Sequence, residues 1–508
     1  MRIQGVRAVN HLLEYLEGTV DEVPLKTAFT DGTDSISFRE LSNRARAVGS
    51  ALSRRGCYRE PVVVYMQKHP DMVNAFFGVL YGGCWYVPLD EDVPEYRVRM
   101  IFENLSPRFV ICDEKTLGRA KEMGGESEFL LFREIRDEEV DEQALREIRK
   151  KSLDIDPAYI VFTSGSTGVP KGVCACHRSV IDYIETLSEV LEFSRETVFG
   201  NQTPLYFDAC LKELYPTLKY GATTFLIPKN LFSFPVKLVE YLNEHRINTI
   251  CWVVSALTIV SGFGTFDTVK PEYLKNVAFG SEVFPAKDLT LWQEALPDAR
   301  FTNLYGPTEG TGMCCYYRVE KHFEPGEPIP IGGPFRNTEI LLLKEDDTPA
   351  EGEEEGEICV RGTCVTLGYY NNPEKTQESF RQNPLNPHYP EIIYRTGDLA
   401  RRNEKGELIF LSRKDDQIKH MGHRIELGEI EAVARLSDGV KQAACVYQKE
   451  KNKILLFYVG DCEEAELRTE LKNKMPRYMQ PHRVRKLSEM PYTPNGKVDR
   501  RKLRESMA

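Results

Sequence analysis

Hydrophobic and polar residues follow two different periods along the first half of the chain, and the two periods alternate. Short β-branched runs such as 61–65 and 108–112 accompany stretches such as 71–81, in which apolar residues recur every three or four positions. The first pattern is typical of buried strands and the second of amphipathic helices. Strands that alternate with helices form parallel sheets covered by helices, so we predict layered α/β subdomains. The same patterns predict further helices over 9–17, 41–52, 98–104 and 236–246, and further strands over 35–41, 84–89, 223–227 and 249–254.

The pattern changes from Glu339 onward. Short strand-like runs separated by acidic and Gly-containing turns predict an antiparallel, β-barrel-like subdomain; the runs are 340–343, 356–360 and 408–410. A polar segment at Asp415 and Asp416 then precedes a helical pattern over 427–433 and strand patterns over 443–447 and 454–458. We therefore predict a large N-terminal domain over 1–412 and a small α+β domain over 413–508.

A loop rich in glycine and hydroxyl residues, 163–172 (TSGSTGVPKG), follows the strand predicted over 159–162. Its glycines let backbone N–H groups approach an anion, its four hydroxyls add donors and Lys171 adds a positive charge. We expect the triphosphate of ATP there. A Walker A loop does not fit, because Pro170 precedes the lysine and Gly172 follows it. From this stretch alone, a surface turn stays open.

Composition narrows the function classes. The chain has 508 residues, enough for two or more domains, and a net charge of -11, which argues against nonspecific nucleic-acid binding. The N-terminus lacks the apolar core of a signal peptide, and there is no uninterrupted apolar run of about 18 residues. Thirteen scattered cysteines favour reduced thiols, and their spacing argues against a metal–thiolate site. We expect a cytoplasmic enzyme without a membrane span.

Eight motifs together carry a family resemblance. They are 80–89 (LYGGCWYVPL), 163–172, 207–210 (FDAC), 303–309 (NLYGPTE), 356–358 (GEI), 394–398 (YRTGD), 424–431 (RIELGEIE) and 495–500 (NGKVDR). In these motifs and their order, the chain resembles the adenylate-forming superfamily. It is more closely similar to the amino-acid adenylation domains of nonribosomal peptide synthetases and to the D-alanine–carrier-protein ligases. The resemblance covers nearly the whole chain.

The resemblance implies a two-step reaction with ATP and Mg²⁺. A substrate carboxylate attacks the α-phosphorus of ATP to give an acyl-adenylate and pyrophosphate, and the acyl group then passes to a thiol. Both steps depend on charge stabilisation. The implied partner is a separate carrier protein bearing a phosphopantetheine thiol, because no carrier domain is visible in the sequence.

The resemblance also assigns a nucleotide site. Glu309 would bind Mg²⁺ and Thr308 the α-phosphate, while Asp398 would accept the ribose hydroxyls. Residues implied to hold the phosphates are Thr163, Ser164, Gly165, Ser166, Thr167, Gly168 and Lys171. Arg413 would lie beside the ribose and Tyr305 near the adenine, and Gly280, Ser281, Glu282, Asn303 and Gly306 would complete the site.

Lys497 resembles the lysine that bridges the substrate carboxylate and the α-phosphate. Its charge would offset the repulsion between the two anions. Because it lies in the small C-terminal domain, the resemblance implies that the two domains close for adenylation and then rotate, with Asp415 at the hinge.

Asp208 resembles the aspartate that binds the α-ammonium of an amino-acid substrate. The implied pocket lining is Ala209, Lys212, Cys251, Val277, Phe279, Leu304, Gly312 and Met313. Lys212 follows Asp208 by four residues and could receive a side-chain carboxylate, which favours an acidic amino acid such as glutamate or aspartate. Equally, Lys212 could lie on a solvated helix face or extend out of the pocket.

Three alternative activities differ in the residues they are expected to carry. D-alanine–carrier-protein ligases carry a cysteine where this chain has Gly280, which makes a small D-amino acid less expected. Acyl-CoA ligases share the ATP site but lack the equivalent of Asp208. A catalytically inactive nucleotide sensor would lack Lys497 or Glu309, and both are present.

Overall fold

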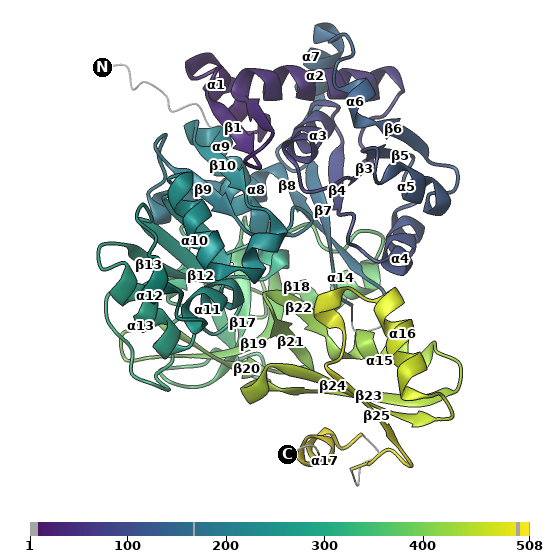
Figure 1. The fold of residues 1–508 in the computed structure, drawn as a ribbon, viewed down its shortest axis with the longest axis vertical. Coiled ribbons are helices and arrows are strands. Elements are labelled where there is room, and N and C mark those ends of the chain that lie inside the picture. The colour runs from purple at the N-terminus through teal and green to yellow at the C-terminus, as the bar shows by residue number, and fades with distance from the viewer. Residues whose placement is uncertain (1–8, 166–167, 494–497, 507–508) are drawn as a thin grey trace. The chain divides into compact units, whose positions relative to one another are not determined.

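The computed structural model describes residues 9–165, 168–493 and 498–506. By its contacts the chain divides into two compact units. Unit 1 comprises 9–91, 107–161 and 173–412 among these residues, and unit 2 comprises 92–106, 162–172 and the segment from 413 onward. Two stretches from earlier in the chain therefore join the C-terminal segment in unit 2. Figure 1 shows the elements of both units in sequence colours.

A nine-stranded sheet forms the centre of unit 1. Its strand order is β15-β14-β13-β12-β11-β9-β10-β1-β2. The strands from β13 to β1 are parallel, and β14, β15 and β2 add antiparallel edges. Their bounds are β1 Thr27–Thr30, β2 Ser35–Ser37, β9 Val198–Asn201, β10 Thr223–Leu226, β11 Thr249–Val253, β12 Asn276–Gly280, β13 Arg300–Tyr305, β14 Cys315–Arg318 and β15 Gly333–Pro334.

A second sheet has six strands in the order β6-β5-β3-β4-β7-β8. The pairs from β6 to β7 are parallel, as the alternating pattern predicts. Their bounds are β3 Pro61–Tyr65, β4 Trp85–Leu89, β5 Phe109–Cys112, β6 Glu128–Leu131, β7 Pro157–Thr163 and β8 Lys171–Cys176. A third sheet of five strands contains antiparallel pairs, as expected for the region after Glu339. Its strands are β16 Thr338–Leu343, β17 Gly356–Gly362, β18 Phe380–Gln382, β19 Ile392–Arg402 and β20 Leu408–Arg413.

Helices cover both faces of the nine-stranded sheet. Helices α8 and α9 pack with one face, and α10, α11 and α13 pack with the other. The helices of unit 1 are α1 Leu13–Glu22, α2 Phe38–Arg54, α3 Pro70–Tyr81, α5 Leu117–Met123, α6 Phe132–Ile135, α7 Glu142–Lys151, α8 His177–Leu191, α9 Leu211–Tyr220, α10 Pro235–Glu244, α11 Val254–Gly262, α12 Thr265–Thr268, α13 Ala286–Ala295 and α14 Pro373–Ser379. Three 3₁₀ turns are η1 Asp208–Cys210, η2 Lys229–Ser233 and η3 Thr308–Gly310.

Two predicted boundaries are wrong near the N-terminus. The strand expected over 35–41 ends at Ser37, because Ser37 and Glu40 form a reciprocal capping box that starts α2 at Phe38. The helix expected over 9–17 begins only at Leu13. The N–H groups of Asn10 and His11 both bond to the Glu14 carboxylate, so these residues form the turn before the helix.

Unit 2 contains helices from two distant parts of the sequence. Arg97 of α4 donates to Glu429 of α15, with a 2.5 Å distance between Arg97 Nη1 and Glu429 Oε1, and both side chains are buried. The elements of unit 2 are α4 Glu95–Leu105, β21 Gln417–His420, β22 His423–Glu426, α15 Leu427–Arg435, β23 Val440–Gln448, η4 Lys449–Lys451, β24 Lys453–Gly460, α16 Glu464–Lys474, η5 Arg477–Met479, β25 Arg483–Leu487 and α17 Arg500–Glu505.

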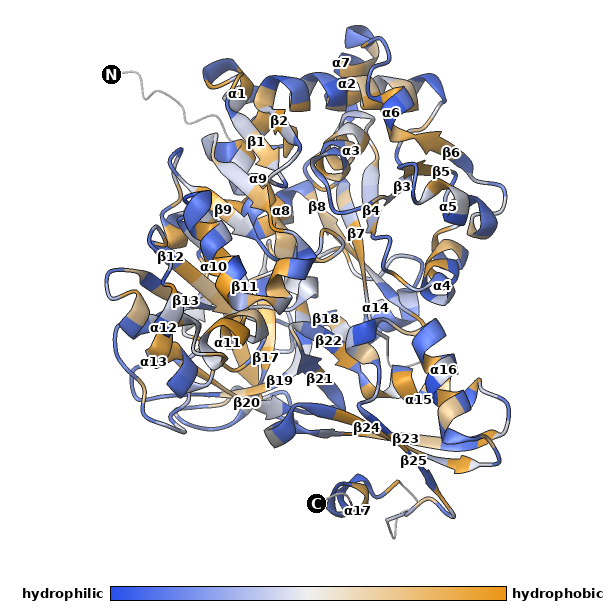
Figure 2. Ribbon diagram, viewed as in Figure 1, coloured by the Kyte–Doolittle hydropathy of each residue, from blue (hydrophilic) through white to orange (hydrophobic). Residues whose placement is uncertain are grey.

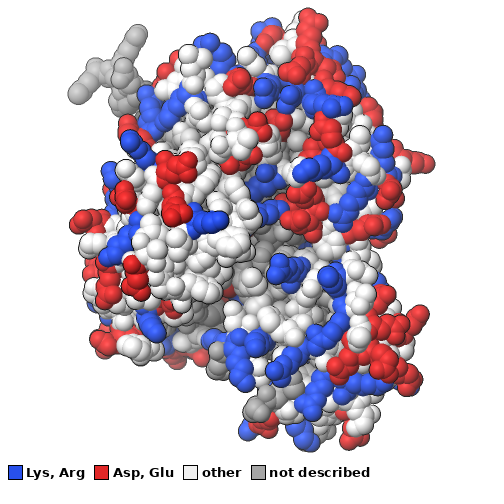
Figure 3. Space-filling view, in the orientation of Figure 1, with Lys and Arg blue, Asp and Glu red and all other residues white. Residues whose placement is uncertain are grey.

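The distribution of hydropathy agrees with these layers. Figure 2 shows hydrophobic residues concentrated on elements such as β6, β12 and α11. Figure 3 shows acidic and basic side chains interspersed over the face in view. All thirteen cysteines are buried thiols. Among the helices that the structure describes, none combines the length and the apolar character needed to cross a bilayer.

Candidate active site

Three parallel strands place small and apolar side chains on one face of the nine-stranded sheet. In the registered pairs, Cys251 of β11 lies beside Ala278 of β12, and Leu304 of β13 lies beside Gly280 of β12. Cys251, Ala278 and Leu304 are buried in the same core cluster as Met313. Helices α8 and α9 cover this face, so the cluster lies between the sheet and α9, which carries Lys212.

Two predicted pocket residues do not join this group. Val277 and Phe279 alternate with Ala278 and Gly280 along β12, so their side chains point to the opposite face of the sheet. There they pack with Trp252 in a separate hydrophobic cluster. Ala278 occupies the place between Cys251 and Leu304 instead. Strand alternation alone would have separated 277 and 279 from 278, but the face of β12 that points toward α9 is known only from the tertiary structure.

Asp208 lies in the short η1 turn that leads into α9, and Ala209 follows it. Burial raises the pKa of Asp208, while a hydrogen bond with Thr308 and the nearby charge of Lys212 oppose that rise. Glu309 adds to the rise through its own negative charge. The structure therefore brings Asp208 of η1, Lys212 of α9, and Thr308 and Glu309 of η3 close together.

Lys212 is buried, with an exposed fraction of 3%. The alternative of a solvated helix face is therefore wrong. Its neighbours Leu211 and Tyr215 on α9 are buried as well. Within the described ranges, no acceptor lies at hydrogen-bonding or ion-pair distance from the Lys212 ammonium, although Asp208 and Glu213 lie near enough to interact electrostatically. An ammonium in this position is ready to bind an anion.

Glu309 is fully buried in η3, immediately after Thr308. The hydroxyl of Tyr369 donates to its Oε1 at 2.7 Å, and the N–H of Thr366 donates to its backbone carbonyl. These contacts fix the orientation of the carboxylate. A carboxylate held in this way offers the oxygen chemistry that Mg²⁺ prefers.

Two glycines in this region allow the backbone to lie close to neighbouring atoms. A side chain on Gly306 would come within 2.4 Å of the carbonyl oxygen of Gly312. Gly312 has φ +88°, and a Cβ there would lie 3.1 Å from the ring of Tyr183. Glycine is therefore required at both positions, because any side chain would clash with these neighbouring atoms.

Tyr305 and Asp398 form a buried pair. Tyr305 ends β13, and its hydroxyl donates to Asp398 Oδ2 at 2.6 Å. Asp398 lies inside the long strand β19, and its N–H donates to the hydroxyl of Thr396. The aspartate is therefore held in a sheet and is not part of a surface turn.

The remaining predicted nucleotide residues of unit 1 lie at the carboxyl ends of β12 and β13. Gly280 ends β12, Ser281 follows with a positive φ of 70°, and Glu282 Oε2 accepts from the N–H of Ser255 at 2.8 Å. Asn303 Nδ2 donates to the carbonyl of Pro330 at 2.8 Å. Ligands of parallel α/β sheets bind at this end of the strands.

The phosphate-loop residues belong to unit 2 by their contacts. Ser164 Oγ donates to the Arg424 carbonyl at 2.8 Å, and the N–H of Gly165 donates to Glu429 Oε2 at 3.2 Å. Lys171 Nζ lies 3.9 Å from Glu426 Oε1. Thr163 ends β7, and Gly168 has a positive φ of 88°. Ser166 and Thr167 lie outside the described residues, and so does Lys497.

Arg413 and Asp415 pair directly. Arg413 Nε and Nη2 donate to the two carboxylate oxygens of Asp415, each at 2.7 Å. Burial alone would raise the pKa of Asp415, but the hydrogen bonds and charge of Arg413 outweigh it, so the net shift is downward. The predicted ribose residue and the predicted hinge residue thus form one bidentate ion pair.

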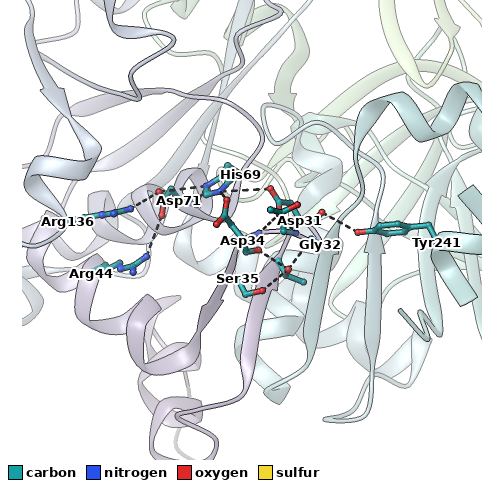
Figure 4. Close-up of polar contacts among 11 residues, drawn as sticks. Asp31, Gly32, Asp34, Ser35, Arg44, His69, Asp71, Arg136 and Tyr241 are labelled. Carbon is teal, nitrogen blue, oxygen red and sulfur yellow. Dashed lines mark hydrogen bonds and ion pairs between the residues drawn. The ribbon is translucent and has the colours of Figure 1, made fainter. Parts of the chain in front are cut away.

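A separate group with metal-ligand chemistry consists of Asp31, Asp34 and His69, whose ligand atoms lie within 4.8 Å of one another. Figure 4 shows His69 between the β1–β2 turn, which carries both aspartates, and the first turn of α3, which carries Asp71. His69 Nδ1 accepts from the Asp71 N–H, and Nε2 lies 3.3 Å from Asp34 Oδ2. These contacts account for the arrangement, so we assign no ion to it.

Comparison with known proteins identifies the family. The sequence profile described as AMP-binding enzyme matches residues 16–370, and that of the AMP-binding enzyme C-terminal domain matches residues 429–497. Tyrocidine synthase 3 of Brevibacillus parabrevis is 33% identical over 502 residues, which cover 96% of this chain. The chain spans only 7% of that relative's length.

Solved structures agree. The crystal structure of IdnL1 is 27% identical with a TM-score of 0.80, and the match covers 96% of this chain and 100% of that one. Holo-AB3403, a four-domain nonribosomal peptide synthetase bound to AMP and glycine, is 27% identical with a TM-score of 0.69. That match covers 96% of this chain and 36% of the synthetase. The chain thus belongs to the AMP-binding enzyme family and resembles the adenylation domains of nonribosomal peptide synthetases.

Proposed function

We propose that this chain activates an amino acid with ATP, forming an aminoacyl-adenylate and releasing pyrophosphate. The observation that carries the proposal is the placement of the half-buried Asp208 beside the half-buried Thr308 and the buried Glu309 in one polar site. A carboxylate there pairs with the α-ammonium of an amino acid, and the two neighbouring residues serve the phosphate chemistry. AB3403, which is 27% identical to this chain, has a structure that holds AMP and glycine, which supports the proposal.

Each predicted site residue has a separate role in this reaction. Asp398 accepts the ribose hydroxyls, and Thr308 donates to the α-phosphate. Glu309 holds Mg²⁺, which supplies charge neutralisation for the phosphates; the fixed orientation of its buried carboxylate supports this role. Lys497 neutralises the approach of the substrate carboxylate to the α-phosphate. The phosphate loop, with Lys171 and the N–H groups around Gly165, holds the β- and γ-phosphates.

We assign the small mobile C-terminal domain, 413–508, the task of carrying Lys497 into the adenylation step. Asp415 is the hinge in this scheme. In this scheme the bidentate pair with Arg413 stabilises one of the two domain arrangements, and rotation about Asp415 breaks it.

The substrate we favour has an acidic side chain. Lys212 is buried, carries a positive charge and lacks a hydrogen-bond acceptor among the residues described, so a carboxylate of glutamate or aspartate would supply the missing partner. Cys251, Ala278 and Leu304 form the apolar wall beside it. A neutral side chain would leave the ammonium without a directly bound carboxylate.

The activated amino acid then passes to the phosphopantetheine thiol of a carrier protein, in the cytoplasm. Thioester formation follows from the family's chemistry, and one relative of this chain is described as a dimodular nonribosomal peptide synthase. D-alanine–carrier-protein ligation and acyl-CoA ligation are the activities to distinguish from it.

ATP–pyrophosphate exchange over a panel of carboxylic acids tests the proposal. The panel contains glutamate, aspartate, their amides, glycine, both enantiomers of alanine and a set of fatty acids. We expect exchange with amino acids and the highest kcat/KM with glutamate or aspartate. Exchange supported by fatty acids alone would overturn amino-acid activation. Preference for D-alanine would retain activation and reject the acidic side chain.

A further inference from the structure

Glu213 is the residue after Lys212 on α9, and it is fully buried. Its Oε2 accepts from Nδ2 of Asn201 at 3.3 Å. Its Oε1 has no hydrogen-bond partner among the residues that the structure describes, and neither does Oδ1 of Asn201. A buried carboxylate with an unpaired oxygen is destabilising unless a cation or a proton compensates it.

Two cations lie near Glu213. Lys68, from the loop before α3, donates to the backbone carbonyls of Asn201 and Gln202 at 3.1 and 3.2 Å, and its third contact is the carbonyl of Ile227 at 3.5 Å. Its donors are therefore already directed at the backbone. Lys212 makes no such hydrogen bonds among the residues that the structure describes. Its positive charge lowers the pKa of Glu213 more than that of Lys68 does. Lys212 is thus the cation available to balance Glu213.

The other ionisable groups that interact with Glu213 or Lys212 come from several neighbouring elements. They are Asp208 and Cys210 of η1, Cys251 of β11 and Tyr183 of α8, in addition to the two lysines. Burial raises the pKa of each of these four groups, so the thiols and the phenol are neutral near pH 7. The charge of the pocket therefore depends on Asp208, Glu213 and the two lysines, and burial lowers the pKa of Lys68 to about 7 against the opposing charge of Glu213.

A substrate carboxylate that binds Lys212 competes with Glu213 for the same ammonium. Two carboxylates beside one buried cation repel each other, and a proton on one of them removes the repulsion. Glu213 is the one without solvent access. Its second oxygen can carry the proton without breaking the hydrogen bond to Asn201.

We propose that Glu213 is a positioning residue for substrate selection: ionised, it compensates the charge of Lys212 without forming an ion pair, and protonated, it leaves that charge to the side-chain carboxylate of an acidic substrate. The inference rests on the proposed acidic preference. It adds that, at pH values where Glu213 is ionised, binding of an acidic amino acid is linked to uptake of a proton by the enzyme, whereas binding of the neutral amide is not.

The linkage between protonation of Glu213 and substrate binding predicts the direction in which affinity changes with pH. Burial raises the pKa of Glu213 to about 8, against the opposing charge of Lys212. Below that pH the residue is already protonated and an acidic substrate binds without cost. Above it a proton must be taken up, so affinity for glutamate falls as pH rises, by about tenfold between about pH 7 and about pH 9.

The first experiment measures Kd for glutamate and for glutamine between about pH 6.5 and about pH 9. The ratio of the two Kd values cancels titration of the α-ammonium that both substrates share. In the native enzyme the preference for glutamate should weaken with rising pH. Glu213→Gln keeps an acceptor for Asn201 and cannot ionise, so its preference should match that of the native enzyme at low pH and should not decline above about pH 8. Glu185→Gln, which removes a carboxylate on α8 that pairs with Lys219, is the matched control and should behave like the native protein.

A second measurement needs no substrate. Infrared titration of the ligand-free protein should show a carboxylic-acid carbonyl band that disappears near the pKa of Glu213 and is missing in Glu213→Gln. Lys212→Met should move that transition to higher pH, because a positive charge is lost. If the native enzyme rejects acidic amino acids but the band behaves as described, only the acidic preference fails. If Glu213→Gln retains the native pH profile, or Lys212→Met leaves the transition unmoved, the role of Glu213 is overturned.

Discussion

The hydroxyl of Tyr305 donates a 2.6 Å hydrogen bond to Oδ2 of Asp398, and both side chains are buried. The bond joins β13 of the nine-stranded sheet to β19 of the antiparallel sheet. It fixes the tyrosine ring and the carboxylate relative to each other. The predicted adenine and ribose residues of unit 1 are therefore held as one rigid pair before any nucleotide binds.

Replacement of Asp398 by alanine should weaken ATP binding. The loss of a charged acceptor for the ribose should raise the KM for ATP by about 10-fold to 100-fold. The KM for the amino acid should change much less. Tyr305→Phe keeps the ring and removes only the hydrogen bond, so a smaller increase is expected. An equal KM for ATP in the native enzyme and Asp398→Ala would remove the aspartate from the nucleotide site.

Lys497→Ala should abolish adenylation while the fold remains intact. The charge is needed only where the substrate carboxylate meets the α-phosphate, so we expect pyrophosphate exchange to fall by at least ~100-fold. The thioester half-reaction, started from a synthetic aminoacyl-adenylate, should be largely retained. Exchange within a few-fold of the native rate would contradict the assignment. Lys502→Ala, in the neighbouring α17, is the control.

Asp208→Ala should raise the KM for the amino acid sharply and leave ATP binding nearly unchanged. The α-ammonium of the substrate would lose its counter-charge in a buried site, and such losses weaken binding by about 2–5 kcal/mol. Initial rates of exchange at varied amino acid and varied ATP separate the two effects. The same KM in both proteins would show that the substrate is not held by its α-amino group.

Lys212→Met should remove the preference for an acidic side chain, because the variant keeps the volume of the lysine stem and loses its charge. Specificity constants for glutamate and glutamine should converge. Lys219→Met is a matched control on the same helix, since Lys219 pairs with Glu185 rather than with the pocket group. A native enzyme that prefers a neutral amino acid, together with a silent Lys212→Met, would refute the acidic pocket.

The paired imidazoles of His11 and His177 should make unit 1 sensitive to acid. Their ring centroids are 3.9 Å apart, and Nδ1 of each accepts a backbone N–H at the start of α1. Burial lowers the pKa of His177 to about 3, and burial together with His177 also lowers the pKa of His11. Both rings are therefore neutral when folded but take up protons when unfolded below about pH 6.5, so stability falls as pH decreases.

Urea unfolding at about pH 7 and about pH 5 measures this effect. His177→Asn keeps an acceptor for the Leu12 N–H and cannot be protonated. Its loss of unfolding free energy between the two pH values should be smaller than that of the native protein by about 2 kcal/mol. The exposed His388, replaced by asparagine, should leave the native pH dependence in place. An unchanged dependence in His177→Asn would show that the buried ring does not contribute.

The sequence alone was sufficient for the class of fold. Strand and helix patterns such as 61–65 and 71–81 correspond to β3 and α3, because a buried parallel strand and an amphipathic helix each leave a local mark on the order of apolar residues. The motifs likewise indicated the family, since glycines and charged residues at fixed spacings can be read without coordinates. Boundaries were less certain where two patterns overlap, as at Ser37.

The sequence alone could not determine which face of a helix or strand points into the pocket. Lys212 follows Asp208 by four residues whether it is solvated or buried, and only the packing of α9 on the sheet makes it 3% exposed. In the same way, 277 and 279 alternate with 278 in any strand, but contact with α9 on one side and with α11 and α13 on the other selects Ala278 for the face of Cys251. Burial and side-chain direction depend on which elements pack together across long stretches of chain. Only the tertiary structure gives this information, because the local helix or strand periodicity of the sequence does not show which elements pack together.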